Sequence, residues 1–228
     1  MSAPLTPPQP PASSRASTIN PAAGDHPITG DPIALAAAIE AGRRTLVRFP
    51  YVEARYGRSG VAFTSSDSGW LVLLADGPPA RCDAQVDWLG GLLSSRGMPH
   101  LLLEFHLAAL AGALTAALPA RAEAWALLAQ TGERLAARRR AQLDDPPLAT
   151  LERTFRDGLD EAGGRMVPAG LGELLGAAVA DEGCGFERSV PSLRDWLVEP
   201  GRFGEAVARA ADAALAEARR LAQAARRG

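Results

Sequence analysis

Apolar residues recur with the period of an α-helix through the middle of the chain. Val86, Leu89 and Leu93 stand at i, i+3 and i+7, which is one face of a helix. Gly97 can end this helix, because a residue without Cβ adopts the left-handed conformation without a clash. Pro99 suits the first turn of a second helix, where its missing N–H is not needed. The pattern predicts a helical hairpin around which the rest of the chain is organised, with a second apolar stripe of Leu102, Phe105, Leu110 and Leu114.

The chain before this hairpin predicts three shorter helical segments. The first begins with Asp31 as an N-cap and Pro32 in the first turn, and it extends toward residue 50. Residues 51–57 predict one or two amphipathic turns. The polar run 64–68 is rich in helix-capping residues, and the apolar run 69–75 behind it suits either a buried strand or a helix. The caps, and the lack of an evident partner strand, favour the helix.

The same periodicity continues after the hairpin. Leu148, Leu151 and Phe155 form the clearest stripe, and Asp145 followed by Pro146 repeats the cap-and-proline start. Further helices are predicted over residues 121–143, 148–159, 171–179, 193–197 and 203–226.

These elements predict an all-α fold, a helical bundle. Residues 1–30 are rich in Pro, Ser, Thr and Ala and carry little apolar surface to offset the entropy of ordering, so we expect a disordered Pro-rich tail there. The Asp-Asp-Pro-Pro step at 144–147 divides the remainder into a helical domain, 31–143, and a C-terminal helical subdomain, 144–228. The second part either stands apart or continues the first bundle.

The amino-acid composition indicates which kinds of molecule this chain is suited to bind. The chain is 47% hydrophobic, which is enough for a sizeable core, and its formal net charge of −2 argues against nucleic acid or an anionic membrane as a partner. Cys82 and Cys184 are far apart and show no metal-binding spacing, which favours two free thiols in a reducing cytoplasm.

The start of the chain lacks the pattern of a signal peptide. Glu104 and His106 interrupt the most apolar stretch, so we expect a core helix rather than a membrane span.

Catalytic motifs are not evident in the sequence. It contains no Walker loop, no His-Glu-x-x-His and no Gly-x-Ser-x-Gly, and no acid/base constellation stands out, which favours a protein that is not an enzyme. His100 and His106 are six residues apart on one helix and point in different directions, so they cannot share a metal ion. His106 is the one candidate cofactor residue, as a haem ligand. The alternative, which we favour, is that His106 is structural and that no cofactor binds.

Three runs resemble a known class of domain: 63–71 (Phe-Thr-Ser-Ser-Asp-Ser-Gly-Trp-Leu), 85–89 (Gln-Val-Asp-Trp-Leu) and 93–99 (Leu-Ser-Ser-Arg-Gly-Met-Pro). Residues 31–143 are thereby similar to the globin-like, often haem-free helical sensory domains of bacterial regulators, of the stressosome co-antagonist type. The chain departs from related modules in lacking the Asp-x-His-x-x-Gly signature of cobalamin binding. The resemblance implies a globin-like domain that binds a ligand or a partner, and it implies no activity.

The sequence therefore predicts a non-enzymatic, cytoplasmic helical protein. We expect a regulatory or sensory role, exerted through a protein partner or a small apolar ligand, with a homodimer through helices as one arrangement. The alternative is a globin-like protein that binds haem or another tetrapyrrole through His106. The four tryptophans lie in apolar periodic contexts and are predicted to be core residues: Trp70, Trp88, Trp125 and Trp196.

Overall fold

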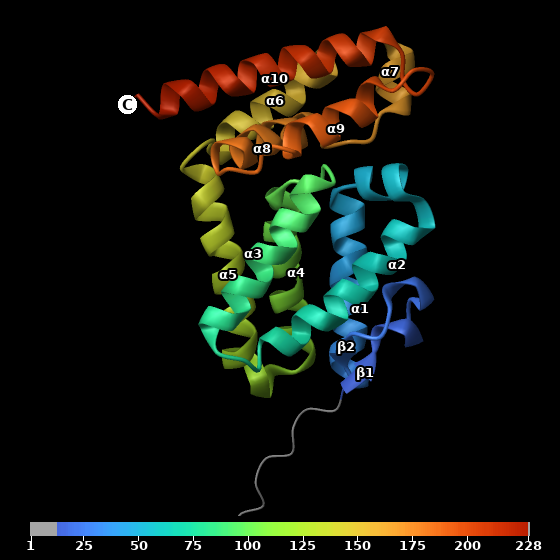
Figure 1. The fold of residues 1–228 in the computed structure, drawn as a ribbon, viewed down its shortest axis with the longest axis vertical. Coiled ribbons are helices and arrows are strands. Elements are labelled where there is room, and N and C mark those ends of the chain that lie inside the picture. Colours follow the sequence, from blue (N-terminus) through green and yellow to red (C-terminus); the bar gives the residue numbers. More distant parts are fainter. Residues whose placement is uncertain (1–12, 228) are drawn as a thin grey trace, which may run out of the picture.

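The computed structural model describes residues 13–227, which form ten α-helices and one two-stranded sheet (Figure 1). The strands are β1 (Ser13–Arg15) and β2 (Pro27–Thr29). The helices are α1 (Pro32–Arg48), α2 (Tyr51–Leu74), α3 (Pro79–Ser95), α4 (His100–Ala117), α5 (Ala122–Arg140), α6 (Asp145–Asp157), α7 (Glu161–Met166), α8 (Leu171–Gly183), α9 (Ser189–Val198) and α10 (Glu205–Ala225). The prediction of an all-α helical bundle is confirmed.

The helices form two groups that meet end to side. In Figure 1, α1 to α5 run along the long axis of the molecule, and α6 to α10 lie across one end of them. Each group has an apolar cluster. The C-terminal cluster also takes in Phe49, Tyr51 and Leu102 from the ends of the first group, so the two groups share buried surface. The predicted boundary at residues 144–147 falls where α5 gives way to α6.

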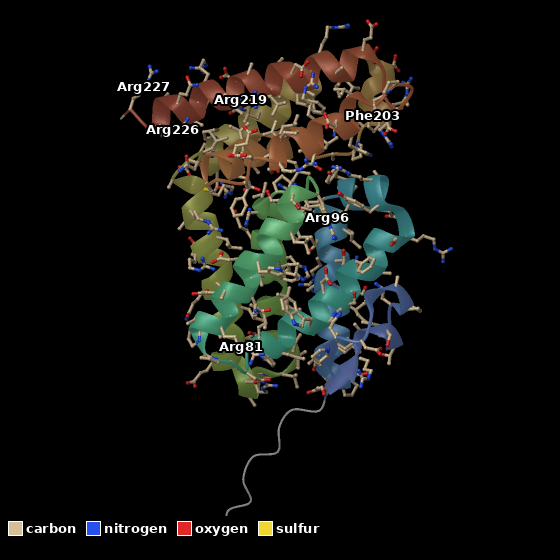
Figure 2. All side chains as sticks on the ribbon, viewed as in Figure 1. Arg81, Arg96, Phe203, Arg219, Arg226 and Arg227 are labelled. Atoms are coloured by element: carbon tan, nitrogen blue, oxygen red, sulfur yellow. The ribbon has the colours of Figure 1, made fainter. Side chains whose placement is uncertain are left out.

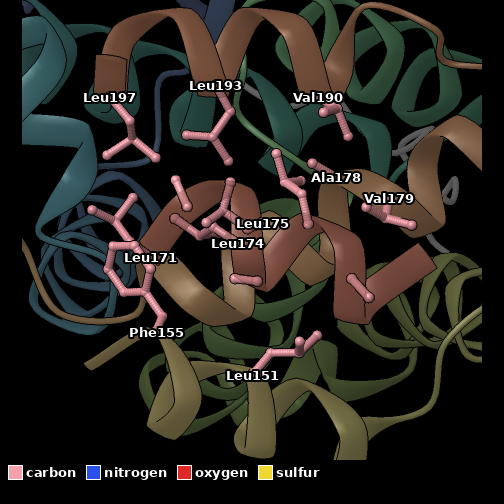
Figure 3. Close-up of a cluster of buried hydrophobic side chains, with 14 of the residues drawn as sticks. Leu151, Phe155, Leu171, Leu174, Leu175, Ala178, Val179, Val190, Leu193 and Leu197 are labelled. Atoms are coloured by element: carbon pink, nitrogen blue, oxygen red, sulfur yellow. The ribbon is translucent and has the colours of Figure 1, made fainter. Parts of the chain in front are cut away.

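Helix α8 is the centre of the C-terminal group. Figure 3 shows Leu174, Leu175 and Ala178 of α8 between side chains of α9, such as Leu193, and those of α6, such as Leu151. Burying a leucine side chain contributes roughly 1.5–3 kcal/mol, and the alternation of large and small residues along α8 lets its neighbours pack closely. This explains why so short a helix is buried along most of its length.

Residues 13–30 are folded where the sequence predicted a tail. β1 pairs with β2 in antiparallel register, Ser13 opposite Thr29. Ile28 is fully buried and packs over Gly69 of α2, where an added Cβ would lie 3.2 Å from the Ile28 Cβ. Asn20 is also buried and its amide donates to the Ser66 hydroxyl. These contacts offset the entropy of ordering a polar segment. Residues 1–12, which carry the rest of the expected tail, lie outside the described residues.

Helix α2 joins segments that the sequence separated. It runs from residue 51 to residue 74, with one non-helical residue, Gly57, at φ 58° and ψ −151°. The helix predicted for 69–75 is thus confirmed through Leu74, but the polar run before it does not cap it. The hydroxyls of Thr64 and Ser68 instead donate to carbonyls four residues back, which satisfies them inside the helix.

The hairpin turn between α3 and α4 is built much as predicted. Gly97 has a φ of +78°, and the Met98 N–H donates to the Leu93 carbonyl across the helix end. Pro99 differs from the prediction in one detail, since it precedes α4 rather than lying in its first turn. The turn is therefore fixed by a left-handed glycine, which few other residues can replace.

The tryptophans are not all core residues. Trp125 is fully buried and Trp196 nearly so, whereas Trp88 is 61% exposed. The prediction for Trp88 is wrong because Val86 and Leu89 turn toward the core, which leaves the side chain between them facing outward. Its ring meets that of the half-buried Trp70 edge to face, with 6.4 Å between centroids.

Helix α4 is long and apolar enough to span a membrane by length and composition alone. Here it packs between α1 and α5 and is largely buried. Its Glu104 is buried and forms an ion pair with Arg139 of α5, 3.0 Å from carboxylate oxygen to Nε. Arg139 also binds Asp145 at the start of α6, which ties the two helix groups together.

Candidate functional site

Helices α2 and α3 enclose a hollow over α4. It has an inner and an outer part, which share Val52, Thr64, Asp67, Leu93 and Met98. The inner part is also lined by Thr45, Leu71, Leu89, Leu102, Leu103 and His106, and the outer part by Tyr56, Ser59, Gly60, Phe63 and Arg96. We call these two parts together the α2–α3 cleft.

The cleft is small. Its cavity volume is about 70 Å³ in the inner part and about 220 Å³ in the outer part. Sites for drug-sized molecules measure roughly 300–1,000 Å³, so the cleft suits a ligand smaller than these. Most of the inner wall is apolar, since leucines from α2, α3 and α4 form it.

Contacts from α2 to α3 and to the turn after it hold the cleft in shape. The Trp70–Trp88 ring pair connects α2 and α3 beside the inner part. Near the mouth, the Tyr56 hydroxyl donates to the Arg96 carbonyl, and the Tyr51 hydroxyl donates to the Gly97 carbonyl at 2.7 Å. Figure 2 labels Arg96 at the end of α3 nearest the C-terminal helices. The cleft is thus bounded by side-chain contacts rather than by close packing of the two helix backbones.

Asp67 is the acidic residue in the cleft wall, and it belongs to both parts. Burial raises the pKa of its carboxyl from 3.8 to about 6, although attraction to His26 and Arg96 opposes the shift. Within residues 13–227 its carboxylate takes part in no hydrogen bond or ion pair. A half-buried carboxyl without a partner is costly for the fold, which makes it a candidate contact for a bound molecule.

His106, the sequence-predicted candidate, lines the inner part of the cleft from α4 and is buried. Its Nδ1 lies 2.9 Å from the Thr45 hydroxyl, and its Nε2 lies 3.1 Å from the Ser68 hydroxyl. Burial lowers its pKa from 6.5 to about 4, so the ring is neutral at pH 7. A neutral imidazole donates from one nitrogen and accepts at the other. The Ser68 hydroxyl donates its one proton to the Thr64 carbonyl, so it accepts from the Nε2–H of the ring. Nδ1 is then the acceptor, and it faces the Thr45 hydroxyl, which also lies 3.0 Å from the Ala41 carbonyl.

Both ring nitrogens of His106 are thus engaged by α1 and α2. A haem iron needs one of them free. The arrangement favours the structural role for His106, in which it joins Thr45 and Ser68 across three helices. The sequence did not foresee these partners, which are 61 and 38 residues away.

His100 occupies a different buried site, between the two helix groups. Its Nδ1 lies 3.1 Å from Oδ2 of Asp181 in α8. The same oxygen accepts hydrogen bonds from the hydroxyls of Ser94, at 2.8 Å, and Ser189, at 3.2 Å. One carboxylate therefore connects α3, α4, α8 and α9. The sequence predicted only that His100 does not share a metal ion with His106.

The residues around His100 include the side-chain types of a hydrolase triad, but not their arrangement. Both serine hydroxyls bind the Asp181 carboxylate rather than the imidazole, and His100 Nε2 has no hydrogen-bond partner. That nitrogen faces the backbone of α3, since a Cβ added to Gly90 would lie 2.4 Å from it. A nucleophilic mechanism needs the serine beside the free ring nitrogen. The cluster instead forms a polar lock, a set of buried polar contacts that hold four helices together.

The described residues hold no group of three or more His, Cys, Asp or Glu side chains that could bind a metal ion. Cys82 and Cys184 are both free thiols, as predicted. Burial raises the pKa of each thiol, which keeps it protonated and unreactive at pH 7.

Asp67 lies in the cleft wall, whereas the sequence pattern placed it in a run of helix-capping residues. One signal could have found it. Thr64, Asp67 and Leu71 stand at i, i+3 and i+7 and share one face of a helix, so a carboxyl there faces the same way as an apolar residue. Comparison of the chain with protein-family models, curated proteins and solved structures gave no match.

Proposed function

We propose that this protein is a non-enzymatic, cytoplasmic sensory or regulatory protein that binds a small, largely apolar molecule in the α2–α3 cleft. The observation that carries the proposal is the cleft itself, an apolar hollow with one carboxyl, that of Asp67, left without a partner. Ligand sites combine apolar walls with a few polar groups that orient the ligand. The resemblance of residues 31–143 to helical sensory domains of bacterial regulators agrees with this role.

Side-chain and backbone contacts connect the wall of the cleft to the C-terminal helices. Arg96 and Met98 line the cleft, and Gly97 between them packs against α9, where an added Cβ would lie 2.9 Å from the Leu193 nitrogen. Arg55 reaches from α2 to the Ser192 hydroxyl of α9. A ligand that shifts the turn between α3 and α4 therefore changes the surface that α9 and its neighbours offer to a protein partner.

Titration with N-phenyl-1-naphthylamine, a neutral apolar dye that brightens in apolar surroundings, tests the proposal. Wild type should bind the dye saturably near one equivalent. Thr64→Phe, which places a ring in the cleft, should abolish this binding. Ser65→Phe makes the same change one position along α2, outside the cleft wall, and should keep it. Circular dichroism checks that both variants are folded. Absence of saturable binding in wild type, or equal binding by folded Thr64→Phe, contradicts the proposal.

The alternative function, haem binding through His106, finds less support in the geometry. Both ring nitrogens have hydroxyl partners, and leucines occupy the space beside the ring.

A further inference from the structure

The polar groups of the α2–α3 cleft are arranged in an order that points to a chemical class of ligand. The inner end is apolar and is formed by side chains such as Leu71, Leu89 and Leu103. Asp67 lies where the inner and outer parts join, since it lines both. A molecule that fills the inner part therefore places its body among leucines and its end group beside a carboxyl.

We propose that the ligand is a small organic amine, with an apolar body in the inner cleft and an ammonium group paired to the Asp67 carboxylate. This inference rests on the proposed function, because it names the ligand class for the same cleft. An ammonium group is positively charged, so it compensates the negative charge of the carboxylate. It also supplies up to three N–H donors.

The other polar side chains of the inner wall already have hydrogen-bond partners, which leaves Asp67 to pair with the ammonium group. His106 is neutral, and its two nitrogens are satisfied by Thr45 and Ser68. The Thr64 hydroxyl donates its proton to the Gly60 carbonyl. Asp67 is thus the strong acceptor in the wall that the described residues leave without a donor.

Other end groups fit the cleft less well. A carboxylate end group would face Asp67 with the same charge in a place of low dielectric. An alcohol would form a hydrogen bond but would leave the charge of Asp67 uncompensated. Arg96 lines the outer part only and is exposed at its mouth, and its attraction to the Asp67 carboxylate is outweighed by the burial that raises the pKa of Asp67.

Competition with the bound dye tests the ligand class with three probes of equal chain length: n-hexylamine, 1-hexanol and hexanoate. A charge-assisted hydrogen bond in a partly buried site is worth about one to two powers of ten in affinity. We expect hexylamine to displace the dye at a concentration about 10- to 100-fold lower than hexanol, and hexanoate to be the weakest of the three at pH 7.5.

Two matched variants assign the preference to one carboxyl. Asp67→Asn should lose the preference for hexylamine over hexanol, with both competitors measured against the dye affinity of the same variant and its fold checked by circular dichroism. Glu53→Gln removes the same charge from an exposed position on α2, outside the cleft wall, and should keep the preference.

The outcomes separate this inference from the proposed function. If the dye binds wild type but hexanol or hexanoate competes as well as hexylamine, the amine assignment is wrong and the ligand cleft stands. The assignment is also wrong if Asp67→Asn keeps the preference. If the dye does not bind wild type at all, both proposals are wrong.

Discussion

Asp67 and His106 line the same inner cleft from α2 and α4, and burial shifts their pKa values in opposite directions. Burial penalises whichever form is charged, so it raises the pKa of the acid and lowers that of the base. Each residue is thereby brought toward its neutral form. The two shifts make opposite contributions to the pH dependence of stability.

The sign follows from which state binds more protons. The pKa of His106 is about 4 when folded and near 6.5 when unfolded, so its contribution to stability is complete above pH 6.5 and is lost as the pH falls toward 4. The pKa of Asp67 is about 6 when folded and near 3.8 when unfolded, so the cost of its burial is largest above pH 6 and is relieved as the pH falls toward 4.

Asp67→Asn should therefore stabilise the protein at pH 7.5, by about 1–3 kcal/mol, because it removes an unpaired carboxylate from the cleft. It should also make the loss of stability between pH 6 and pH 4 steeper, since the opposing contribution of Asp67 is gone. Urea unfolding at pH 7.5, 6 and 4.5 measures both effects. A variant that is less stable than wild type at pH 7.5 would contradict the assignment of Asp67 as an unpaired buried carboxyl.

Hemin should not form a specific complex through His106. Its Nδ1 and Nε2 are held by Thr45 and Ser68, so coordination would break one of these buried hydrogen bonds. We expect only a weak, non-saturating spectral change on hemin titration, equal in wild type and in His106→Ala. A sharp Soret band at one equivalent that disappears in His106→Ala would establish the globin-like alternative instead.

Gly97→Val should strongly destabilise the protein, because Gly97 is a buried turn residue with a positive φ. The positive φ of Gly97 alone makes a β-branched residue cost about 1–3 kcal/mol. An added Cβ would also lie 2.4 Å from Arg55 Nη1 and 2.9 Å from the Leu193 backbone nitrogen, and the latter cannot move without shifting α9. Thermal unfolding measures the loss.

Gly112→Val is the matched control for Gly97→Val. Gly112 lies in α4 with no atom within 4 Å of an added Cβ, so the same substitution there should change the free energy of unfolding by less than about 0.5 kcal/mol. Equal melting temperatures for wild type and Gly97→Val would show that the turn is built differently.

Trp88→Ala should cost less than about 1 kcal/mol, because the ring is largely exposed and loses mainly its edge contact with Trp70. Trp125→Ala should lower the free energy of unfolding by about 3–5 kcal/mol, since it leaves a cavity in place of a fully buried ring. Chemical unfolding of the two variants side by side measures the difference. Similar losses for both would place Trp88 in the core after all.

Features that depend on neighbours along the chain could be predicted from the amino-acid pattern. The stripe of Leu148, Leu151 and Phe155 is buried as its spacing predicts. Asp31 caps α1, accepting hydrogen bonds from the backbone N–H groups of Ile33 and Ala34. Helical periodicity and caps are visible in the sequence because they involve residues within a turn or two of each other.

Features that join distant residues emerge in the folded chain and have no local signal. The partners of His106, the lock between His100 and Asp181, and the burial of Ile28 against α2 all connect segments from different elements. The α2–α3 cleft, with Asp67 in its wall, depends on how far two helices diverge over a third. Periodicity fixes which face of a helix is apolar, but the same face can meet a neighbour closely or leave space, and side chains from other helices decide which of these occurs.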